Sequence, residues 1–267
     1  MKKPITRHDG RDARFYEVEG QMLPSVTTIL SALAKPALIA WSANVERAAC
    51  VEAAADLFAD WSAAIVPPQM PRAAYVATLA ARIGPTKASQ KQLTAAGDIG
   101  SATHKMIEWS LRQQLFADAG PEPVIPDQSL WGYMAWQDFA RSVSLKPLLT
   151  ERTVYSLTHG YAGTLDLLAR VNGVVTTIEL KTSKAIYPEA FLQACAYKVA
   201  MEEMGYAPQA ALIVRLPKLL TDPAFEVVTV PPVAELFATF VALKAVWTWN
   251  YANEQAYRAR TKTVKVA

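Results

Sequence analysis

Two carboxylates and a lysine stand out, because a predicted hairpin turn would bring them together. Asn172 and Gly173 separate two runs rich in β-branched residues, and Asn-Gly is the strongest short-range signal for a two-residue type I′ turn. Counting outward from that turn, Asp166 lies directly opposite Glu179, with the Cβ atoms about 4.5–5.5 Å apart. Lys181 is two residues beyond Glu179 and shares its face of the strand.

This pair of acids predicts a metal site. Like charges at such a distance repel each other, and a divalent cation removes the conflict. Hard cations prefer carboxylate and carbonyl oxygens, so the carbonyl of Leu180 is a further candidate ligand. The alternative is a surface ion pair between Glu179 and Lys181 with an aspartate nearby by chance. The other strand face is expected to enter a core through Leu165, Leu167, Ala169, Ile178 and Leu180.

The elements that position these residues change in character along the chain. After an extended pair at 15–23, helical periodicity dominates the first half, and alternating β-branched runs appear only later. We expect helices at 25–33, 36–65, 71–82, 87–113, 127–143, 188–204 and 233–257, and strands at 147–157, 164–171, 174–182, 210–216 and 225–230. This order predicts an α/β (α+β) fold in which helices flank a central mixed sheet, with a helical N-terminal half.

A proline-rich stretch marks the expected boundary between the two halves. Pro121, Pro123 and Pro126 are typical of a linker. We therefore expect a helical region at 1–125 and, at 126–267, a core that carries Asp166, Glu179 and Lys181, with both regions integrated into one domain.

The composition allows a packed core and disfavours a disordered chain, a disulfide-rich scaffold and an iron–sulfur protein. Hydrophobic residues make up 52% of the chain and charged residues 19%, which disfavours disorder. The net charge of +3 permits a nucleic-acid partner without requiring one. Two cysteines, Cys50 and Cys195, are too few for a disulfide framework or a four-cysteine iron–sulfur cluster. The polar start and the lack of a long apolar run predict a cytoplasmic protein without a membrane segment.

Several motifs follow one another in a fixed order. They are Leu23–Leu30, Gly100–His104, Gly163–Asp166 with Ile178–Ser183, and a helix carrying Gln193 and Tyr197. This series resembles the PD-(D/E)XK nuclease superfamily, in its RecB-like and phage-type exonuclease branch, and is similar to mitochondrial genome maintenance exonucleases. The family's proline before the aspartate is replaced by Leu165. The resemblance implies a restriction-endonuclease-like core.

The resemblance also implies a ligand set. His104, Asp166, Glu179 and the Leu180 carbonyl would hold Mg²⁺ or Mn²⁺, as one or two ions, and no iron–sulfur cluster is expected. Without the motif, His104 would be interpreted as a core or capping histidine.

Further roles follow from the same resemblance. Lys181 would orient or deprotonate the attacking water, and Gln193 would position that lysine or the scissile phosphate. Tyr197 would line the site, with core packing as the alternative. Glu151, which begins the strand before the hairpin, matches a recurrent acidic position of the branch and is assigned to substrate binding, with a surface charge as the alternative.

Two segments are candidates for contacts with the nucleic acid. Ser25 and Thr27 could bind a phosphate at a helix N-terminus, although an ordinary N-cap explains them equally well. Some of the tryptophans, among them Trp61, could stack on bases, although helix-spaced aromatic residues usually belong to a core.

The function expected from this sequence is a metal-dependent DNA exonuclease of bacterial or phage origin. It would act on single-stranded DNA or duplex ends in recombination, replication or end processing, with a single-strand annealing or recombination protein as a possible partner. A structure-selective or flap endonuclease and a non-catalytic DNA-binding module remain as alternatives. A metal-dependent hydrolase of small molecules would explain the acids but not Lys181 and Gln193.

Overall fold

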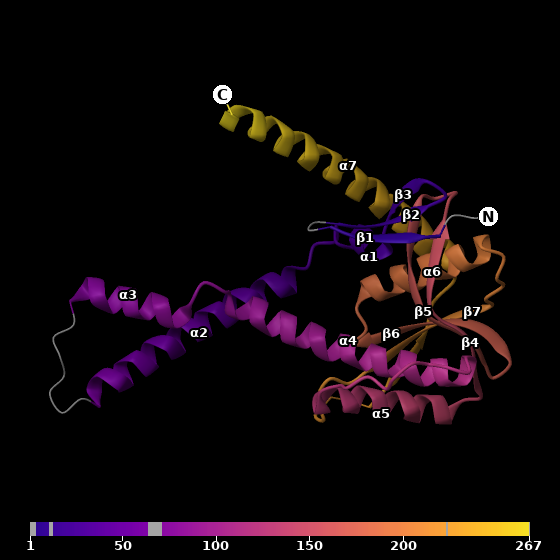
Figure 1. Ribbon diagram of the computed structural model, residues 1–267, viewed down its shortest axis with the longest axis horizontal. Helices are drawn as coiled ribbons and strands as arrows, with labels where there is room; N and C mark the ends of the chain where they lie inside the picture. The colour runs from indigo at the N-terminus through magenta and orange to yellow at the C-terminus, as the bar shows by residue number, and fades with distance from the viewer. Residues whose placement is uncertain (1–3, 11–12, 64–70, 223, 267) are drawn as a thin grey trace. The chain divides into compact units, whose positions relative to one another are not determined.

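The computed structural model describes residues 4–10, 13–63, 71–222 and 224–266. Its elements fall into two compact units, shown in Figure 1. The larger unit comprises Met1–Leu33 and Ile99–Ala267, and the helical unit comprises Ala34–Asp98. The domain boundary expected near residue 125 stays a prediction.

A five-stranded mixed sheet forms the centre of the larger unit. Its strands follow the order β4 (Leu145–Ser156), β5 (Tyr161–Val171), β6 (Val174–Thr182), β7 (Ala210–Leu216) and β8 (Glu226–Thr229). Strands β6 and β7 are parallel and the other neighbours are antiparallel. The parallel pair needs a crossover, which α6 (Pro188–Glu203) supplies. The predicted mixed sheet is therefore confirmed.

Helices cover both faces of this sheet, and each face has its own core. On one face, α4 (Ala88–Leu115) and α5 (Asp127–Ser142) contribute Ile107 and Phe139, which pack with Leu167 and Ile178. The other core combines residues of α1 (Val26–Leu30), α6 and α7 (Val233–Val266) with the sheet. Because both faces are covered, most residues of β5, β6 and β7 are buried, as expected for the central strands of a sheet packed on two sides.

A small second sheet precedes the helices. Strands β1 (Thr6–Asp9), β2 (Arg14–Val18) and β3 (Gln21–Pro24) form an antiparallel meander. Tyr16 and Leu23 of this meander pack against Ala162 at the start of β5. The extended pair expected at 15–23 is confirmed, whereas the polar strand β1 was not expected.

The helical unit contains α2 (Pro36–Ser62), α3 (Arg72–Ile83) and the first part of α4. The carboxylate of Glu46 accepts hydrogen bonds from the backbone N–H groups of Ala88 and Ser89, at 3.1 and 2.9 Å. These bonds satisfy amides at the start of α4 that have no partner within the helix, and the negative charge suits that helix end.

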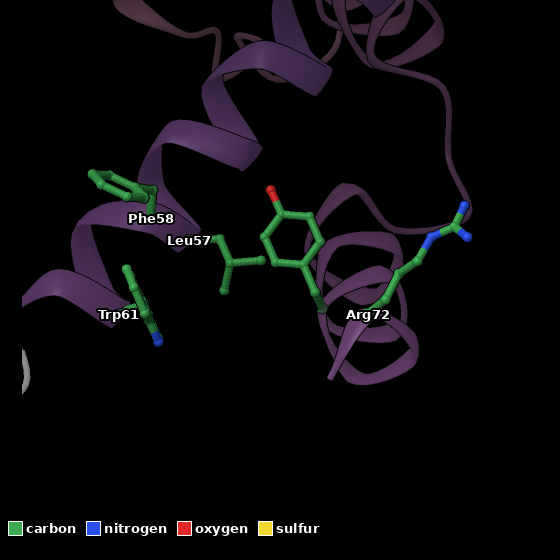
Figure 2. A pocket seen from close by; sticks show the side chains of 5 residues that line it. Leu57, Phe58, Trp61 and Arg72 are labelled. Atoms are coloured by element: carbon green, nitrogen blue, oxygen red, sulfur yellow. The ribbon is translucent and has the colours of Figure 1, made fainter. Parts of the chain in front are cut away.

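A hollow of about 370 Å³ lies between α2 and α3 of the helical unit. Figure 2 shows Leu57, Phe58 and Trp61 along α2, with Arg72 on the neighbouring helix. Base stacking by Trp61 stays a prediction. Within the described residues, no helix combines the length and apolar character needed to cross a bilayer.

Candidate metal and phosphate site

The hairpin that carries the two acids forms with the predicted register. Asn172 and Gly173 have φ angles of 50° and 87°, as both central residues of a type I′ turn must. Pairing runs without a slip from Val171 opposite Val174 to Leu167 opposite Ile178. Asp166 and Glu179 are the next residues along the two strands.

Regular pairing is interrupted at Asp166. On the β4 side, the paired positions pass from Thr150 opposite Leu167 to Arg152 opposite Leu165. Glu151, between them, has a φ of 46°, in the left-handed region that is uncommon for residues other than glycine. Strained backbone of this kind persists only where its surroundings hold it, and it is common in functional sites.

This irregularity corrects one expectation from the sequence. Leu165 does not share a core with Leu167, Ala169, Ile178 and Leu180, because it packs into the core formed with α1 and α6. Strict alternation of side chains requires an unbroken strand, and the backbone departs from that geometry opposite Glu151.

Asp166 lies at the centre of a cluster of possible metal ligands. One of its oxygens, Oδ2, accepts a 2.7 Å hydrogen bond from the backbone N–H of Leu180, while Oδ1 lies 3.6 Å from Nδ1 of His104. One ligand atom each from His104, Glu151 and Asp166 lie within 4.8 Å of one another. The arrangement brings together two predicted ligands and adds Glu151, which the sequence had suggested for substrate binding.

A glycine explains how the helix that carries His104 comes so close to the sheet. A Cβ atom built on Gly100 would lie 2.5 Å from Oγ1 of Thr182, at the end of β6. Only a residue without a side chain permits this approach. His104 follows one helical turn later, on the part of α4 that belongs to the larger unit. The neighbouring Gly97 has open space instead.

Beside this cluster, Glu179, Lys181, Gln193 and Tyr197 form a hydrogen-bonded chain. Nζ of Lys181 donates to Oε1 of Glu179 at 2.7 Å and to Oε1 of Gln193 at 2.8 Å. Nε2 of Gln193 bonds to the hydroxyl oxygen of Tyr197 at 3.2 Å. Glu179 is only 3% exposed, and its second oxygen, Oε2, is buried without a hydrogen-bond partner among the described residues.

The charges of the site are strongly coupled. Burial and the nearby carboxylate of Asp166 raise the pKa of Glu179 to about 7. Burial and Asp166 likewise raise the pKa of Glu151 to about 8, although its side chain reaches solvent. Burial disfavours the charge of Asp166, but the cationic neighbours His104 and Lys181 outweigh it and hold its pKa below the usual value. The positive charges of His104 and Lys181 therefore do not compensate the negative charges of all three acids, Asp166, Glu179 and Glu151.

The site favours the charged form of Lys181, whereas it disfavours the charged form of Glu179. Burial disfavours the charge on Lys181, but the Glu179 carboxylate outweighs burial and raises the pKa of Lys181. A similar balance, in which Asp166 outweighs burial, raises the pKa of His104. Lys181 therefore stays protonated near neutral pH.

The remaining predicted residues lie in different surroundings. Ser25 is 2% exposed and caps α1, with its Oγ accepting a hydrogen bond from the Thr28 N–H at 3.0 Å. Thr27 is exposed. Contacts of these two residues with a phosphate, and of the Leu180 carbonyl with a metal, stay predictions. No sequence pattern pointed to Tyr16, whose hydroxyl lies 2.9 Å from Oγ1 of Thr164 on β5.

The lack of a side chain at Gly163 leaves room for the ring of Tyr197. Replacement of Gly163 by alanine is therefore expected to destabilise the protein. The new Cβ atom would lie 2.5 Å from Cε1 of the Tyr197 ring, and overpacking of this kind costs about 1–3 kcal/mol. Denaturant unfolding measures the change. Gly97→Ala is the matched control, since its Cβ meets open space within α4 and should stabilise the helix by up to about 1 kcal/mol. Equal stability of Gly163→Ala and the wild type would contradict this packing argument.

Comparisons with known proteins identify similar solved structures but no family. No family model matches the chain, and a search of curated proteins finds no match. An alkaline exonuclease from Laribacter hongkongensis is 16% identical, with a TM-score of 0.39, and the match covers 64% of this chain and 92% of that protein. The complex of the same exonuclease with dAMP gives 18% identity, a TM-score of 0.38 and the same coverage. Likeness at this level does not establish an activity.

Proposed function

We propose that this chain is a divalent-metal-dependent nuclease that hydrolyses phosphodiester bonds of DNA from an end. The observation that carries the proposal is the buried oxygen Oε2 of Glu179, which has no hydrogen-bond partner among the described residues, in a carboxylate that the charge of Asp166 repels. An unpartnered buried carboxylate oxygen is costly in a folded protein unless a cation satisfies it.

The donor set fits Mg²⁺ or Mn²⁺. Carboxylate oxygens from Asp166, Glu179 and Glu151 together with one imidazole suit Mn²⁺, and Mg²⁺ accepts the oxygens. Positive charge at this point would also relieve the competition that raises the pKa values of Glu179 and Glu151. When bound, one or two such ions supply Lewis acidity and lower the pKa of water.

Lys181 and Gln193 would act on the phosphate and the attacking water. Because its pKa is raised, Lys181 is better suited to stabilising the negative charge that develops on the phosphate than to removing a proton from water. Nζ of Lys181 is held by two hydrogen bonds, one to Gln193 and one to Glu179. Fixing the lysine in this way reduces the reorganisation needed during the reaction.

The pH dependence of stability offers a test of the metal site. Glu179 and Glu151 have ordinary pKa values of 4.5 and folded-state values of about 7 and 8, so the folded protein binds more protons than the unfolded chain between these limits. The stability that these groups contribute is therefore lost as pH rises from about 4.5 through 8. In EDTA, unfolding experiments at pH 5.5 and 8.5 should show the less stable protein at the higher pH.

Metal should reverse this trend, because metal binding requires deprotonated carboxylates. At pH 8.5, a Mn²⁺ concentration one hundred times the Kd at that pH should stabilise the protein by about 2.7 kcal/mol. The same Mn²⁺ concentration should stabilise it much less at pH 5.5, where protonation weakens metal binding. A Mn²⁺ effect that is independent of pH would argue that these carboxylates are not ligands.

Cleavage from an end is supported by the resemblance of the motif series, and a direct assay decides it. End-labelled linear single- and double-stranded DNA and a closed circle are incubated with Mg²⁺, Mn²⁺ or EDTA. The proposal expects metal-dependent loss of the linear molecules alone, with the label giving the polarity. Cutting of the circle would indicate an endonuclease. DNA binding without cleavage under any metal would indicate a non-catalytic binding module.

A further inference from the structure

The side of α4 that carries His104 continues away from the metal cluster as a row of residues. His104, Glu108, Arg112 and Phe116 follow one another at intervals of four residues, the spacing of neighbours on a helix surface. Phe116 comes directly after α4, but its backbone N–H still donates to the Arg112 carbonyl at 2.9 Å, so the helical path reaches it. Because four residues slightly exceed one turn, the row winds around α4. The side chain of His104 is 26% exposed, whereas Phe116 is 53% exposed, so the row leads from the cluster into solvent.

Neighbouring members of this row contact each other. Nη1 of Arg112 lies 3.7 Å from Oε1 of Glu108, and Cζ of the same guanidinium lies 5.4 Å from the centre of the Phe116 ring. Besides burial and the charge of Asp166, the nearby carboxylate of Glu108 raises the pKa of Glu151, so the row begins beside the cluster. The pair of Arg112 and Phe116 is therefore an exposed continuation of the candidate metal and phosphate site.

The chain that follows α4 is tied back to the helix. Nε1 of Trp109 donates a hydrogen bond to the Gly120 carbonyl at 3.0 Å, and the Gly120 N–H donates to Oδ1 of Asp118 at 2.8 Å. Phe116 is the first residue of this returning segment, so its backbone is held by α4 on one side and by these bonds on the other. An aromatic ring that is held in this way loses less conformational entropy when a ligand stacks on it.

A guanidinium beside an exposed aromatic ring suits a nucleotide. The N–H donors of arginine match the oxygens of a phosphate, and an exposed ion pair such as the one with Glu108 restrains Arg112 only weakly. The ring of Phe116 offers its face to a base, and such stacking tolerates any base. Within a duplex the faces of the bases are covered by their neighbours, so the ring favours an unpaired strand. Arg112 lies about 12 Å along the helix axis from His104, a span of three to four nucleotides at roughly 3.4 Å each.

We propose that Arg112 and Phe116 form a subsite for single-stranded DNA, in which Arg112 binds a phosphate and Phe116 stacks on an adjacent base; this inference rests on the proposed function. The strand extends from the metal and phosphate site along α4 to this subsite. A protein is the less suitable occupant, because the row is continuous with a site that is suited to a phosphodiester. The subsite lies away from the scissile bond, so it contributes affinity for the strand and leaves the chemical step to the cluster.

Fluorescence anisotropy with labelled oligo-dT and with a duplex of equal length tests this proposal. The measurements are made in EDTA, so that binding is recorded without cleavage. Phe116→Ala should weaken binding of the single strand about tenfold and leave duplex binding within about twofold. Phe116→Trp should restore the affinity, whereas Phe116→Leu, which is apolar but has no ring, should not. Arg112→Gln should reduce the slope of log K against log salt for the single strand by about 0.7, the value for one phosphate.

Cleavage kinetics give a second readout. With metal present, Phe116→Ala should raise the KM for a long dT oligonucleotide about tenfold, because the lost interaction is made equally in the ground state and the transition state. Thymidine 5′-p-nitrophenyl phosphate is too short to reach from the cluster to Arg112, so its KM should not respond to the same substitution. An equal change in KM for both substrates would indicate a disturbed cluster and overturn the inference.

Matched controls use an aromatic ring and an arginine elsewhere on the larger unit. Trp249→Ala removes a ring that is 68% exposed on α7, and Arg141→Gln removes an ion-paired arginine of α5; both should bind oligo-dT as the wild type does. Unchanged single-strand affinity of Phe116→Ala would overturn the inference, as would wild-type protein that does not bind oligo-dT. A failure of the proposed function would differ from both: the wild type would bind oligo-dT, lose affinity with Phe116→Ala, and cleave no DNA with any metal.

Discussion

Replacing Lys181 by alanine is expected to lower the rate of DNA cleavage by about 10²–10³-fold, the usual effect of removing one group that stabilises transition-state charge. Nζ of Lys181 donates hydrogen bonds to Glu179 and Gln193. Lys181 is the one residue of the four in this hydrogen-bonded chain that can carry a positive charge. Single-turnover cleavage of end-labelled DNA under saturating metal measures the effect on the chemical step.

A matched control exists on α6. Lys198 also forms an ion pair with a glutamate, Glu202, but it takes no part in the hydrogen-bonded chain of the site. Lys198→Ala should therefore cleave DNA at the wild-type rate. Wild-type cleavage by Lys181→Ala itself would exclude the lysine from the chemistry and leave its ion pair with Glu179 as a structural feature.

Replacing Asp166 by asparagine is expected to have the larger effect, a loss of about 10³-fold or more in cleavage together with weakened Mn²⁺ binding. Loss of several kcal/mol of metal-dependent charge stabilisation corresponds to that factor. Asparagine keeps an oxygen that can accept the hydrogen bond from the Leu180 N–H, so the fold should survive. Titration calorimetry with Mn²⁺ and the cleavage assay measure the two effects separately.

Asp138→Asn is the control for this prediction, since Asp138 is an exposed aspartate paired with Arg141 on α5. It should bind Mn²⁺ and cleave DNA as the wild type does. Mn²⁺ binding at wild-type affinity by Asp166→Asn would remove Asp166 from the ligand set, whatever happens to cleavage.

The sequence predicted the parts of the fold that depend on local rules. The Asn172–Gly173 turn determined the register of the hairpin, and strands β6 and β7 have the expected bounds, 174–182 and 210–216. A type I′ turn leaves little freedom in how its strands pair, and apolar runs between turn residues are distinctive. The predicted end of α7 is residue 257, but the helix continues to Val266. The sequence did not predict this continuation, because the last turns have neither the periodicity of a packed face nor a stop signal.

The candidate site was predicted less completely, because it depends on contacts between distant segments. The left-handed backbone of Glu151 and the transfer of Leu165 to the other core have no local signature. The proximity of Glu151 to His104 joins β4 to α4, and no spacing rule connects those elements. The proposed ligand and catalytic roles of Asp166, Glu179 and Lys181 stay predictions until the variants are measured.

The hairpin also limits where the sequence can accept insertions and deletions. Between the acids and the turn the two strands pair without a slip, so a residue added or lost there would turn the side chain of Asp166 or Glu179 to the opposite face of the sheet. The Asn172–Gly173 turn lies roughly 20 Å from the acids, at about 3.3 Å per residue. Descendants of this sequence should therefore accumulate length changes at the turn, and an inserted epitope tag or fluorophore should be tolerated best there.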